Sequence, residues 1–436
     1  MQKRDSSSRL PVPAGPLGRP VRFGTTVRHS IPYKVLCARG WREVDDDSWD
    51  FFYADVGWIH ENVPYASSRR EQGGPRLGEH QKVNHFPNHV ELTRKDLMAK
   101  NVKRAMKNEK AKDAKTGAYD FIPVTFILPN EGAMMLRHFR ENGGMWIMKP
   151  IGRAQGKGIF LASKPAQIES WMKDRGNQRA ENVCYENYVA QRYLDDPYLV
   201  GGKKFDMRIY CVCLSFNPLT IYLYREGFAR FTATRYSTAK SDIDNPYVHL
   251  TNHAIQKKDE KYDAEVSDLK WSLGELKRFM TTKHGGDAVN ACFHGIQGII
   301  INSLKSVQNV IINDKRCFEM YGYDVMIDAD LKPWLIEVNA SPSMSSDTQS
   351  DHDLKFGLLD DMLTVIDLEG HFSRKKNIPK RVGGFDLICE NGCEVSPNCD
   401  GYENSDLGSS LPTMLGTHND RVDSLKKLRK WCREDD

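Results

Sequence analysis

Two consecutive β-type segments near residue 330 constrain the fold more than any other part of the sequence. YGYDVMID (321–328) and PWLIEVNASPS (333–343) are rich in apolar and aromatic residues, and turn-forming residues 329–332 separate them. This pattern predicts a β-hairpin. Both strands carry carboxylates among large apolar residues, so the chain must bring charged groups close to a core.

Three oxygen-bearing side chains of this hairpin are predicted to converge. Glu337 and Asn339 lie two residues apart on one strand and therefore share a face, and Asp324 falls opposite or diagonal to Glu337 across the turn. Two carboxylates and an amide are the hard oxygen ligands that Mg2+ prefers, and its other positions stay open to nucleotide phosphates and water. The alternative, a polar outer face of an amphipathic hairpin, does not account for a carboxylate between Ile336 and Val338.

A glycine-rich loop follows another short strand, MWIMKP (145–150). The strand places Lys149 at the mouth of GRAQGKG (152–158). Glycines there let backbone N–H groups approach phosphate oxygens, and the lysine supplies a positive charge. The loop is not a Walker A loop, because the spacing GxxxxGK[ST] followed by a helix is absent. It gains its meaning from sharing a chain with the hairpin.

Polar residues elsewhere complete a candidate nucleotide site. Residues 191–194 end a strand just before a turn, so their backbone could hydrogen-bond an adenine edge as a hinge. The other candidates are strand and turn residues suited to ribose and phosphate contact: Lys204, Asp206 and Arg208 on one strand face, Arg225 and Arg230 beside a turn, and Thr251 and Asn252 in HLTNHAIQK. Together they supply a cation, a hinge, a second row of cations and a metal site, in the order that an ATP site needs.

The size and charge of the chain exclude several classes of protein. With 436 residues, 40% of them hydrophobic, the chain can bury a large core in two or three packed domains. No apolar run reaches the roughly 18–20 residues of a membrane span. The first residues lack the apolar region of a secretory signal, so we expect a soluble intracellular protein without a membrane partner. The net charge of +4 argues against a dedicated nucleic-acid binder.

Positive charge is nevertheless concentrated in one segment. RKDLMAKNVKRAMKNEKAKDAK (94–115) is strongly basic and has helical spacing. Two interpretations remain open. The segment is either a solvated helix face or a surface for an acidic partner, which would act through attraction and faster encounter.

The ordered set of motifs resembles the tubulin tyrosine ligase-like family, a branch of the ATP-grasp fold. The matching segments are WIMKP, GRAQGKGI, VAQRYL, KKFDMRIY, the LTNHAIQK stretch and the YGYDVMID–PWLIEVNASPS hairpin, within residues 85–367. NHFPNHVELTRKDLMAKNVKR (84–104) also resembles this family, particularly its polyglutamylase members. The resemblance implies an α/β (α+β) ATP-grasp fold with small N-terminal, central and C-terminal domains.

Five parts are expected along the chain: a disordered N-terminus (1–30), an N-terminal α/β domain with the basic helix (31–120), a central ATP-grasp domain (121–245), a C-terminal ATP-grasp domain with the hairpin (246–370) and an irregular polar tail (371–436). Periodicity predicts a long helix over 287–308, and a short basic helix is expected over 422–432. A polar loop over 64–79 interrupts the N-terminal domain.

The resemblance also implies roles for individual positions. Contacts with ATP are implied for Lys149, Gln155, Gly156, Gln191, Arg192, Tyr193, Leu194, Lys204, Phe205, Asp206, Thr251 and Asn252. Mg2+ would be held by Asp324, Glu337 and Asn339. Catalytic charge near the γ-phosphate would come from Arg208, Arg230 and Lys149. The amino-acid and protein substrates would meet Gln155, Arg230 and Lys270.

The implied activity is an ATP- and Mg2+-dependent ligation of glutamate to glutamate side chains or branches on tubulin C-terminal tails, through an acyl-phosphate. Gln155 favours elongation, because chain-lengthening members tend to carry glutamine near this position and branch-starting members arginine. The alternatives are a tubulin glycine ligase, a small-metabolite ATP-grasp ligase and an inactive microtubule scaffold.

The expected partners are microtubules and free L-glutamate. A targeting protein is also expected, because the chain has no long cationic C-terminal region. The expected location is the cytoplasm and cytoskeleton, in a cilium or flagellum axoneme or a basal body.

Overall fold

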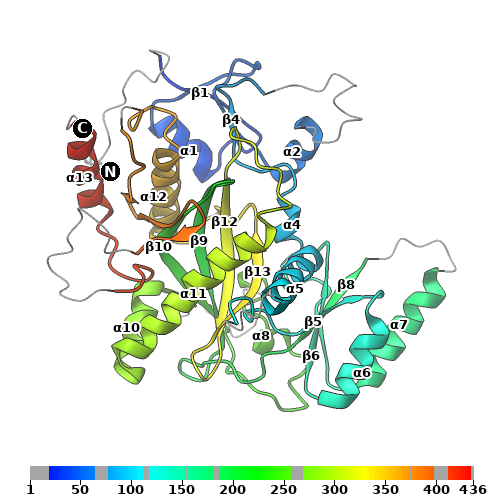
Figure 1. Cartoon of the computed structure of the whole chain (residues 1–436). Helices are drawn as coiled ribbons and strands as arrows, with labels where there is room; N and C mark the ends of the chain where they lie inside the picture. The colour runs from blue at the N-terminus through cyan, green and yellow to red at the C-terminus, as the bar shows by residue number, and fades with distance from the viewer. Residues whose placement is uncertain are drawn as a thin grey trace.

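The computed structural model describes residues 19–63, 77–111, 117–153, 155–179, 186–256, 269–373, 375–396 and 411–433. Within these residues the chain forms three β-sheets, of four, eight and four strands, with helices packed on them (Figure 1). The predicted mixed α/β class is therefore confirmed. No helix in the described ranges combines the length and apolar character that crossing a membrane requires.

The N-terminal part is a small parallel sheet with the strand order β2-β1-β3-β4. Its strands are β1 (Arg22–Thr25), β2 (Arg42–Glu43), β3 (Phe51–Tyr53) and β4 (Lys82–Val83), and its helices are α1 (Ile31–Ala38) and α2 (Val56–Asn62). The prediction of disorder over 1–30 is wrong for β1. Phe23 on this strand is fully buried in the core, and this burial offsets the entropy cost of ordering the strand. Residues 1–18 and most of the predicted loop over 64–79 lie outside the described residues.

A four-stranded antiparallel sheet carries the glycine-rich loop, with the order β5-β8-β6-β7. Its strands are β5 (Thr125–Leu128), β6 (Trp146–Pro150), β7 (Phe160–Ala162) and β8 (Tyr188–Arg192), and its helices are α6 (Gly132–Asn142) and α7 (Pro165–Arg179). The strand predicted for MWIMKP is β6. Trp146 on this strand is fully buried and packs against Phe126 and Phe139, which joins the sheet to α6.

The largest sheet has eight antiparallel strands and contains the predicted hairpin. The main path is β13-β12-β9-β10-β15-β14, with β11 paired to β10 and β16 to β15. The strands are β9 (Phe205–Phe216), β10 (Leu219–Phe231), β11 (Lys270–Ser272), β12 (Glu319–Ile327), β13 (Pro333–Asn339), β14 (Arg381–Val382), β15 (Phe385–Glu390) and β16 (Cys393–Glu394). One sheet thus crosses the expected boundary at residue 245, since β9 pairs with β12. The division into central and C-terminal domains stays a proposal.

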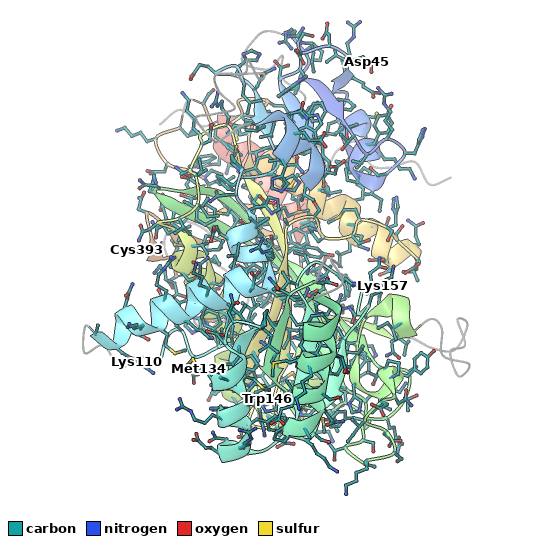
Figure 2. All side chains as sticks on the ribbon, turned by 90° about the vertical axis from the view of Figure 1, so that its right-hand side faces the viewer. Asp45, Lys110, Met134, Trp146, Lys157 and Cys393 are labelled. Atoms are coloured by element: carbon teal, nitrogen blue, oxygen red, sulfur yellow. The ribbon has the colours of Figure 1, made fainter. Side chains whose placement is uncertain are left out.

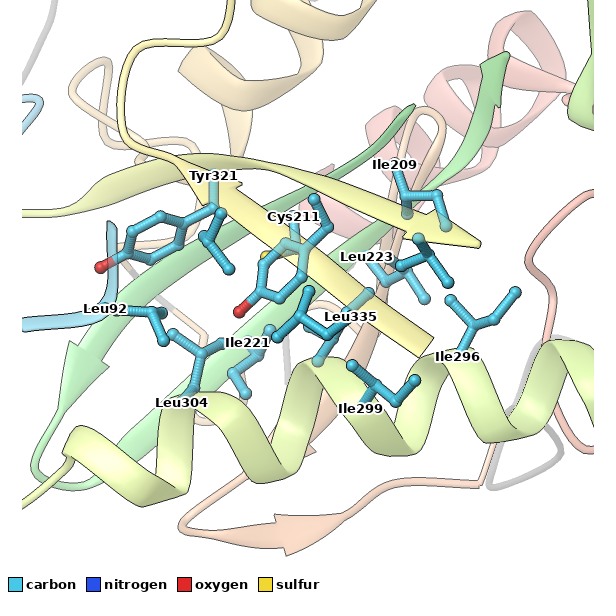
Figure 3. Close-up of a cluster of buried hydrophobic side chains, with 14 of the residues drawn as sticks. Leu92, Ile209, Cys211, Ile221, Leu223, Ile296, Ile299, Leu304, Tyr321 and Leu335 are labelled. Atoms are coloured by element: carbon cyan, nitrogen blue, oxygen red, sulfur yellow. The ribbon is translucent and has the colours of Figure 1, made fainter. Parts of the chain in front are cut away.

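Helix α11 (Gly286–Val307) covers one face of the large sheet, with α10 (Leu273–His284) beside it. Figure 3 shows Ile296, Ile299 and Leu304 of α11 directed at Ile209, Ile221 and Leu335 of the sheet, all of them buried. Ile299 and Leu304 lie three and eight residues after Ile296, which keeps the three side chains on one helical face. The long helix predicted over 287–308 is confirmed.

The opposite face is covered by α12 (Gln349–Val365) and α1, and α13 (Arg421–Arg433) lies at the edge of the molecule (Figure 1). The helix predicted over 422–432 is α13. The predicted irregular tail is wrong for β15, because Phe385 and Leu387 enter the core and pair the strand with β10. The polar composition of 371–436 concealed this strand, whose apolar residues are few but well placed.

Two short helices and one long helix lie between the eight-stranded sheet and the antiparallel four-stranded sheet that contains β5 to β8. These are α8 (Pro246–His249), α9 (His253–Gln256) and α5 (Lys95–Ala111), with α4 (Val90–Thr93) just before α5. Figure 1 shows α5 beside β13 on one side and the four-stranded sheet on the other. The first residue of α5 and the last residue of α8 therefore face the space between the sheets, which holds the candidate site.

Candidate functional site

Most of the predicted site residues line a cleft between the eight-stranded sheet and the antiparallel four-stranded sheet that contains β5 to β8. Its polar lining consists of Lys95, Lys149, Arg153, Gln155, Gln191, Arg192, Tyr193, Lys204, Asp206, His249, Thr251, Asn252, Asp324 and Glu337. Its apolar lining consists of Pro123, Ile147, Pro150, Ile159, Leu194, Leu250, Met326 and Ile336, and Gly156 lies among them. A cleft that combines apolar walls with charged and polar groups suits a nucleotide, because the base is buried and the phosphates are charged.

Lys149 is held at the bottom of the cleft by its neighbouring strand. Its ammonium donates to Oε1 of Gln191 at 2.7 Å, and Gln191 donates in turn to the hydroxyl of Thr125 at 3.0 Å. Burial lowers the pKa of Lys149 to about 8. The lysine is thus poised to become fully charged when an anion arrives beside it.

The glycine-rich loop turns through left-handed backbone conformations. Gln155 has φ 60° and Gly156 has φ 76°. A Cβ at Gly156 would lie 2.3 Å from Cδ1 of Ile255, so a larger residue would displace that side chain, and the positive φ itself favours glycine. Gln155 lines the cleft from this loop. Lys157, two residues farther along the loop, is labelled in Figure 2. The loop therefore brings backbone and the Gln155 amide to the cleft while keeping the chain close to α9.

The predicted hinge and Lys204 form one hydrogen-bonded group. The ammonium of Lys204 donates to the hydroxyl of Tyr193 at 2.8 Å and to the main-chain oxygen of His249 at 3.0 Å. It also lies 4.4 Å from the centre of the Tyr193 ring. Burial, followed by the charge of Lys149, lowers the pKa of Lys204 to about 7.

A ladder of charged pairs connects β9, β10 and β12. Arg230 donates to both oxygens of Asp206 at 2.7 Å, and Thr251 adds a bond to the same carboxylate at 2.7 Å. Arg208 donates to Asp324 at 2.6 Å, and Arg230 reaches Asp324 at 2.8 Å. Burial by itself would raise the pKa of Asp324, but the charges of Arg208 and Arg230 hold this pKa far below its usual range. Two fixed guanidinium groups thus lie behind the carboxylates that line the cleft.

The hairpin has the predicted register. Asp324 pairs with Glu337, and Gly322 pairs with Asn339. The Asn339 amide nitrogen lies 3.3 Å from the main-chain oxygen of Gly322 and 3.4 Å from Oε1 of Glu337, which holds the amide beside this carboxylate. The donors are oxygen atoms only, which is the chemistry of Mg2+. The Lys95 ammonium lies 3.5 Å from Oε2 of Glu337, so this position already stabilises a positive charge. The residues therefore fit a metal ion.

Five residues with an implied role lie outside the cleft lining: Phe205, Arg208, Arg230, Asn339 and Lys270. Phe205 packs into the core against Phe231 and Tyr198 rather than facing the cleft. Arg208, Arg230 and Asn339 lie directly behind lining residues through the contacts just described. Their predicted roles remain predictions.

Lys270 lies farther along the same side of the sheet. It pairs with Arg230 in the β10–β11 register. Its ammonium lies 3.2 Å from Asp351 and 5.1 Å from the centre of the Phe228 ring. Lys355 bonds to the same carboxylate oxygen at 3.0 Å. The predicted substrate lysine thus lies beside Arg230 on the neighbouring strand, outside the cleft lining, and its role stays a prediction.

Sequence reasoning missed several lining residues. Lys95 was included only in the surface helix, yet it contacts Glu337 and donates to the main-chain oxygen of Arg153 at 3.4 Å. His249 was part of a quoted motif but received no role. The apolar walls at Ile147 and Met326 carry no signal of their own, because buried strand residues look alike in sequence.

Comparison with known proteins gives a consistent result. The model of the Tubulin-tyrosine ligase family matches residues 73–374. Probable tubulin polyglutamylase TTLL9 of Bos taurus is 41% identical over 440 residues, covering 94% of this chain and 92% of that protein. Probable alpha-tubulin polyglutamylase Ttll1 of Tetrahymena thermophila is 42% identical over 379 residues, covering 82% and 90%. Tubulin polyglutamylase TTLL5 of Homo sapiens is 36% identical over 346 residues, covering 76% of this chain and 25% of that protein.

Proposed function

Because the chain belongs to the tubulin-tyrosine ligase family, we propose that it is an ATP-dependent carboxylate–amine ligase that adds glutamate to the C-terminal tails of tubulin. One observation carries the proposal. Apolar residues and the predicted hinge line the cleft together with Lys149. Asp324 and Glu337 also line it, and Arg208 and Arg230 contact Asp324 from behind. This sequence of groups matches, in order, the base, the phosphates and the metal of an ATP complex.

The reaction requires activation of a carboxylate, which is a poor electrophile. A carboxylate oxygen of the acceptor attacks the γ-phosphorus of ATP, the bond to ADP breaks, and ADP leaves. The amine of free glutamate then attacks the acyl carbon, loses a proton and expels inorganic phosphate, which leaves an amide. The side chains have little proton transfer to perform, since the leaving groups are phosphates.

The protein groups act mainly by fixed charge. Arg208 and Arg230 are buried and held by Asp324 and Asp206, so their guanidinium groups need no reorganisation as charge moves during phosphoryl transfer. Lys149 adds a third cation from the other sheet. Mg2+ held by Asp324, Glu337 and Asn339 would neutralise the charge of the ATP phosphates.

The acceptor is proposed to approach along α5. This helix begins in the cleft at Lys95 and runs outward to Lys110 (Figure 2). Lys100, Arg104 and Lys107 are exposed and spaced by four and three residues, so they form a stripe on one face. A cationic stripe that leads into the cleft favours a polymeric acidic acceptor over a small metabolite.

Elongation of an existing glutamate chain is proposed over initiation of a new branch. Gln155 lines the cleft from the glycine-rich loop, where a neutral amide and a charged guanidinium would hold different acceptor geometries. Mass spectrometry of products on synthetic tail peptides, with and without a one-glutamate branch, tests this. We expect labelling of the branched peptide and a shift to the unbranched one in Gln155→Arg. Wild type that labels only the unbranched peptide contradicts it.

A direct assay tests the activity as a whole. Purified protein is incubated with ATP, Mg2+ and tubulin, together with labelled glutamate, glycine or tyrosine in turn, and a targeting partner is supplied by adding cell extract. We expect incorporation of glutamate. Incorporation of glycine would select the glycine ligase instead, and ATP binding without any incorporation would select the scaffold. Localisation to a cilium or basal body, visible with a tagged protein, is the proposed cellular setting.

A further inference from the structure

A chain of hydrogen bonds runs from Lys204 through the hinge to the segment before α8. The Lys204 ammonium donates to the Tyr193 hydroxyl at 2.8 Å, the hydroxyl lies 2.9 Å from Nδ1 of His249, and Nε2 of His249 lies 2.9 Å from the main-chain oxygen of Asp242. The three side chains are only 3–4% exposed. Tyr193 directly follows β8, Lys204 directly precedes β9 and His249 ends α8, so the chain of bonds joins both sheets to the segment between them.

The donor and the acceptor of every bond in this chain follow from the last bond, which His249 makes with the main-chain oxygen of Asp242. A main-chain oxygen only accepts, so Nε2 of His249 carries the hydrogen that it donates to Asp242. In a neutral ring Nδ1 then has a free lone pair and accepts the Tyr193 hydrogen. The Tyr193 oxygen is left with lone pairs for the Lys204 ammonium. Burial, followed by the charge of Lys204, lowers the pKa of His249, which agrees with a neutral ring.

This arrangement ties the position of Lys204 to one tautomer of His249. If Nδ1 did not accept, the Tyr193 hydrogen would need another acceptor in a buried site, and the hydroxyl would rotate away from its present geometry. The hydrogen bond from Lys204 to this oxygen would then be misaligned. Its ammonium also faces the rings of Tyr193 and Tyr236, at 4.4 and 5.7 Å from their centres, and those contacts do not fix its direction.

We propose that His249, as the Nε2–H tautomer, is a positioning residue that directs Lys204 and the hinge residue Tyr193 toward the bound nucleotide. The inference rests on the proposed ATP binding. It assigns to His249 an effect on nucleotide affinity, and hence on KM for ATP, rather than on the chemical step.

Two substitutions of similar size separate this role from simple packing. His249→Asn places its amide oxygen near the former Nδ1 and keeps an acceptor for Tyr193, but it loses the bond to Asp242. His249→Gln reaches the Asp242 oxygen with its amide nitrogen and leaves the Tyr193 hydroxyl without its acceptor. We expect the Gln variant to bind Mg-ATP about tenfold more weakly, or roughly 1.4 kcal/mol, and the Asn variant to stay within about twofold of wild type.

Calorimetric titration of the full-length chain with a non-hydrolysable ATP analogue and Mg2+ measures this effect, and thermal unfolding without nucleotide serves as the control for folding. In turnover assays the Gln variant should show a raised KM for ATP with kcat retained. Tyr193→Phe should weaken binding about as much as His249→Gln, and combining the two should add little, since both break the same chain of bonds.

The outcomes separate the inference from the function on which it rests. If wild type does not bind Mg-ATP, the proposed function fails. If wild type binds and the Asn and Gln variants change affinity equally, or only in step with their melting temperatures, His249 has a packing role and the inference is overturned. Additive effects of Tyr193→Phe and His249→Gln would overturn it as well. If both His249 variants fail to fold, Tyr193→Phe alone decides, and unchanged affinity in it overturns the inference.

Discussion

Two buried ammonium groups dominate the site at the scale of single residues. Lys149 and Lys204 lie in one cleft, and each is bonded to a neutral partner, Gln191 or Tyr193. Burial depresses their pKa values to about 8 and about 7. In the free protein these lysines therefore lose their protons as pH rises through that range, whereas bound phosphates favour the charged forms.

This leads to a pH dependence of nucleotide binding. ATP affinity should be highest below about pH 7, where both lysines are charged, and fall as pH rises, by up to about tenfold per pH unit where one proton must be taken up. Calorimetric titration between about pH 7.5 and 9, in two buffers of different ionisation enthalpy, measures both the affinity and the proton uptake. Lys149→Met should reduce the uptake. Affinity that stays constant over this range would contradict the charged-lysine model.

Glu337 is the residue that tests the metal assignment. It faces Asp324 across the hairpin and holds the Lys95 ammonium at 3.5 Å. Glu337→Gln should leave the fold intact and lower the ligation rate at least about a hundredfold, because a loss of several kcal/mol is typical when metal charge is removed from phosphoryl transfer. Asp330→Asn, in the turn of the same hairpin, is the control. Near wild-type turnover of Glu337→Gln at saturating Mg2+ would show that the metal is bound elsewhere.

At the scale of elements, α5 contributes to the cleft with its first residue, Lys95, and to the protein surface with its exposed basic side chains. Lys103 belongs to the basic segment predicted over 94–115, but it pairs with Glu131 at 3.1 Å and lies over the Phe126 ring. The exposed stripe is Lys100, Arg104 and Lys107. Periodicity alone does not predict which lysine on a basic helix finds a partner on a neighbouring helix.

Charge reversal of this stripe tests whether it guides an acidic acceptor. Changing Lys100, Arg104 and Lys107 to Glu should raise KM for tubulin several-fold and flatten the salt dependence of the rate, because attraction to acidic tails is screened by salt. ATP affinity should not change. The matched control reverses Lys426, Lys427 and Arg433 on α13, at the far edge of the molecule (Figure 1). Equal effects from the two triple variants would mean that only net charge matters.

At the scale of the whole molecule, a buried ionic cluster ties the N-terminal sheet to the C-terminal half. Arg39, just after α1, donates to Asp360 at 2.7 Å and to Glu369 at 3.0 Å, and Trp41 donates to Glu369 at 2.8 Å. Although burial would raise it, hydrogen bonds from His371 and Arg39 hold the pKa of Glu369 at about 2. The cluster joins segments more than 300 residues apart, as the sequence separation of 330 for Arg39 and Glu369 shows.

Removing the arginine should therefore destabilise the whole protein without touching the cleft. Arg39→Met leaves the buried Glu369 without its arginine, whereas Asp360 keeps Arg421, and we expect a loss of about 3 kcal/mol in the free energy of unfolding. Urea titration measures it, with the exposed Arg433→Met as control. In wild type the contribution of Glu369 is present above its ordinary pKa of 4.5 and is lost as pH falls toward 2. A variant as stable as wild type at neutral pH would contradict this role.

Local chemistry determined the parts of this protein that the sequence alone predicts. The hairpin register, the glycine-rich loop at Lys149, the basic helix and the long apolar helix over 287–308 all follow from spacing and turn residues within a short stretch of chain. Periods of 2.0 and 3.6 residues and the steric freedom of glycine act over a few residues, so they are visible without the fold. The ordered motifs then sufficed to indicate the family.

The tertiary structure decided which distant groups meet. Lys95 enters the cleft, Phe205 turns away from it, Arg230 bridges Asp206 and Asp324, and His249 accepts from Tyr193. The tail after residue 370 supplies a core strand. These outcomes depend on how two sheets and the helices between them pack, and a buried contact is selected by shape and desolvation across the whole fold. No local pattern in the sequence contains that information.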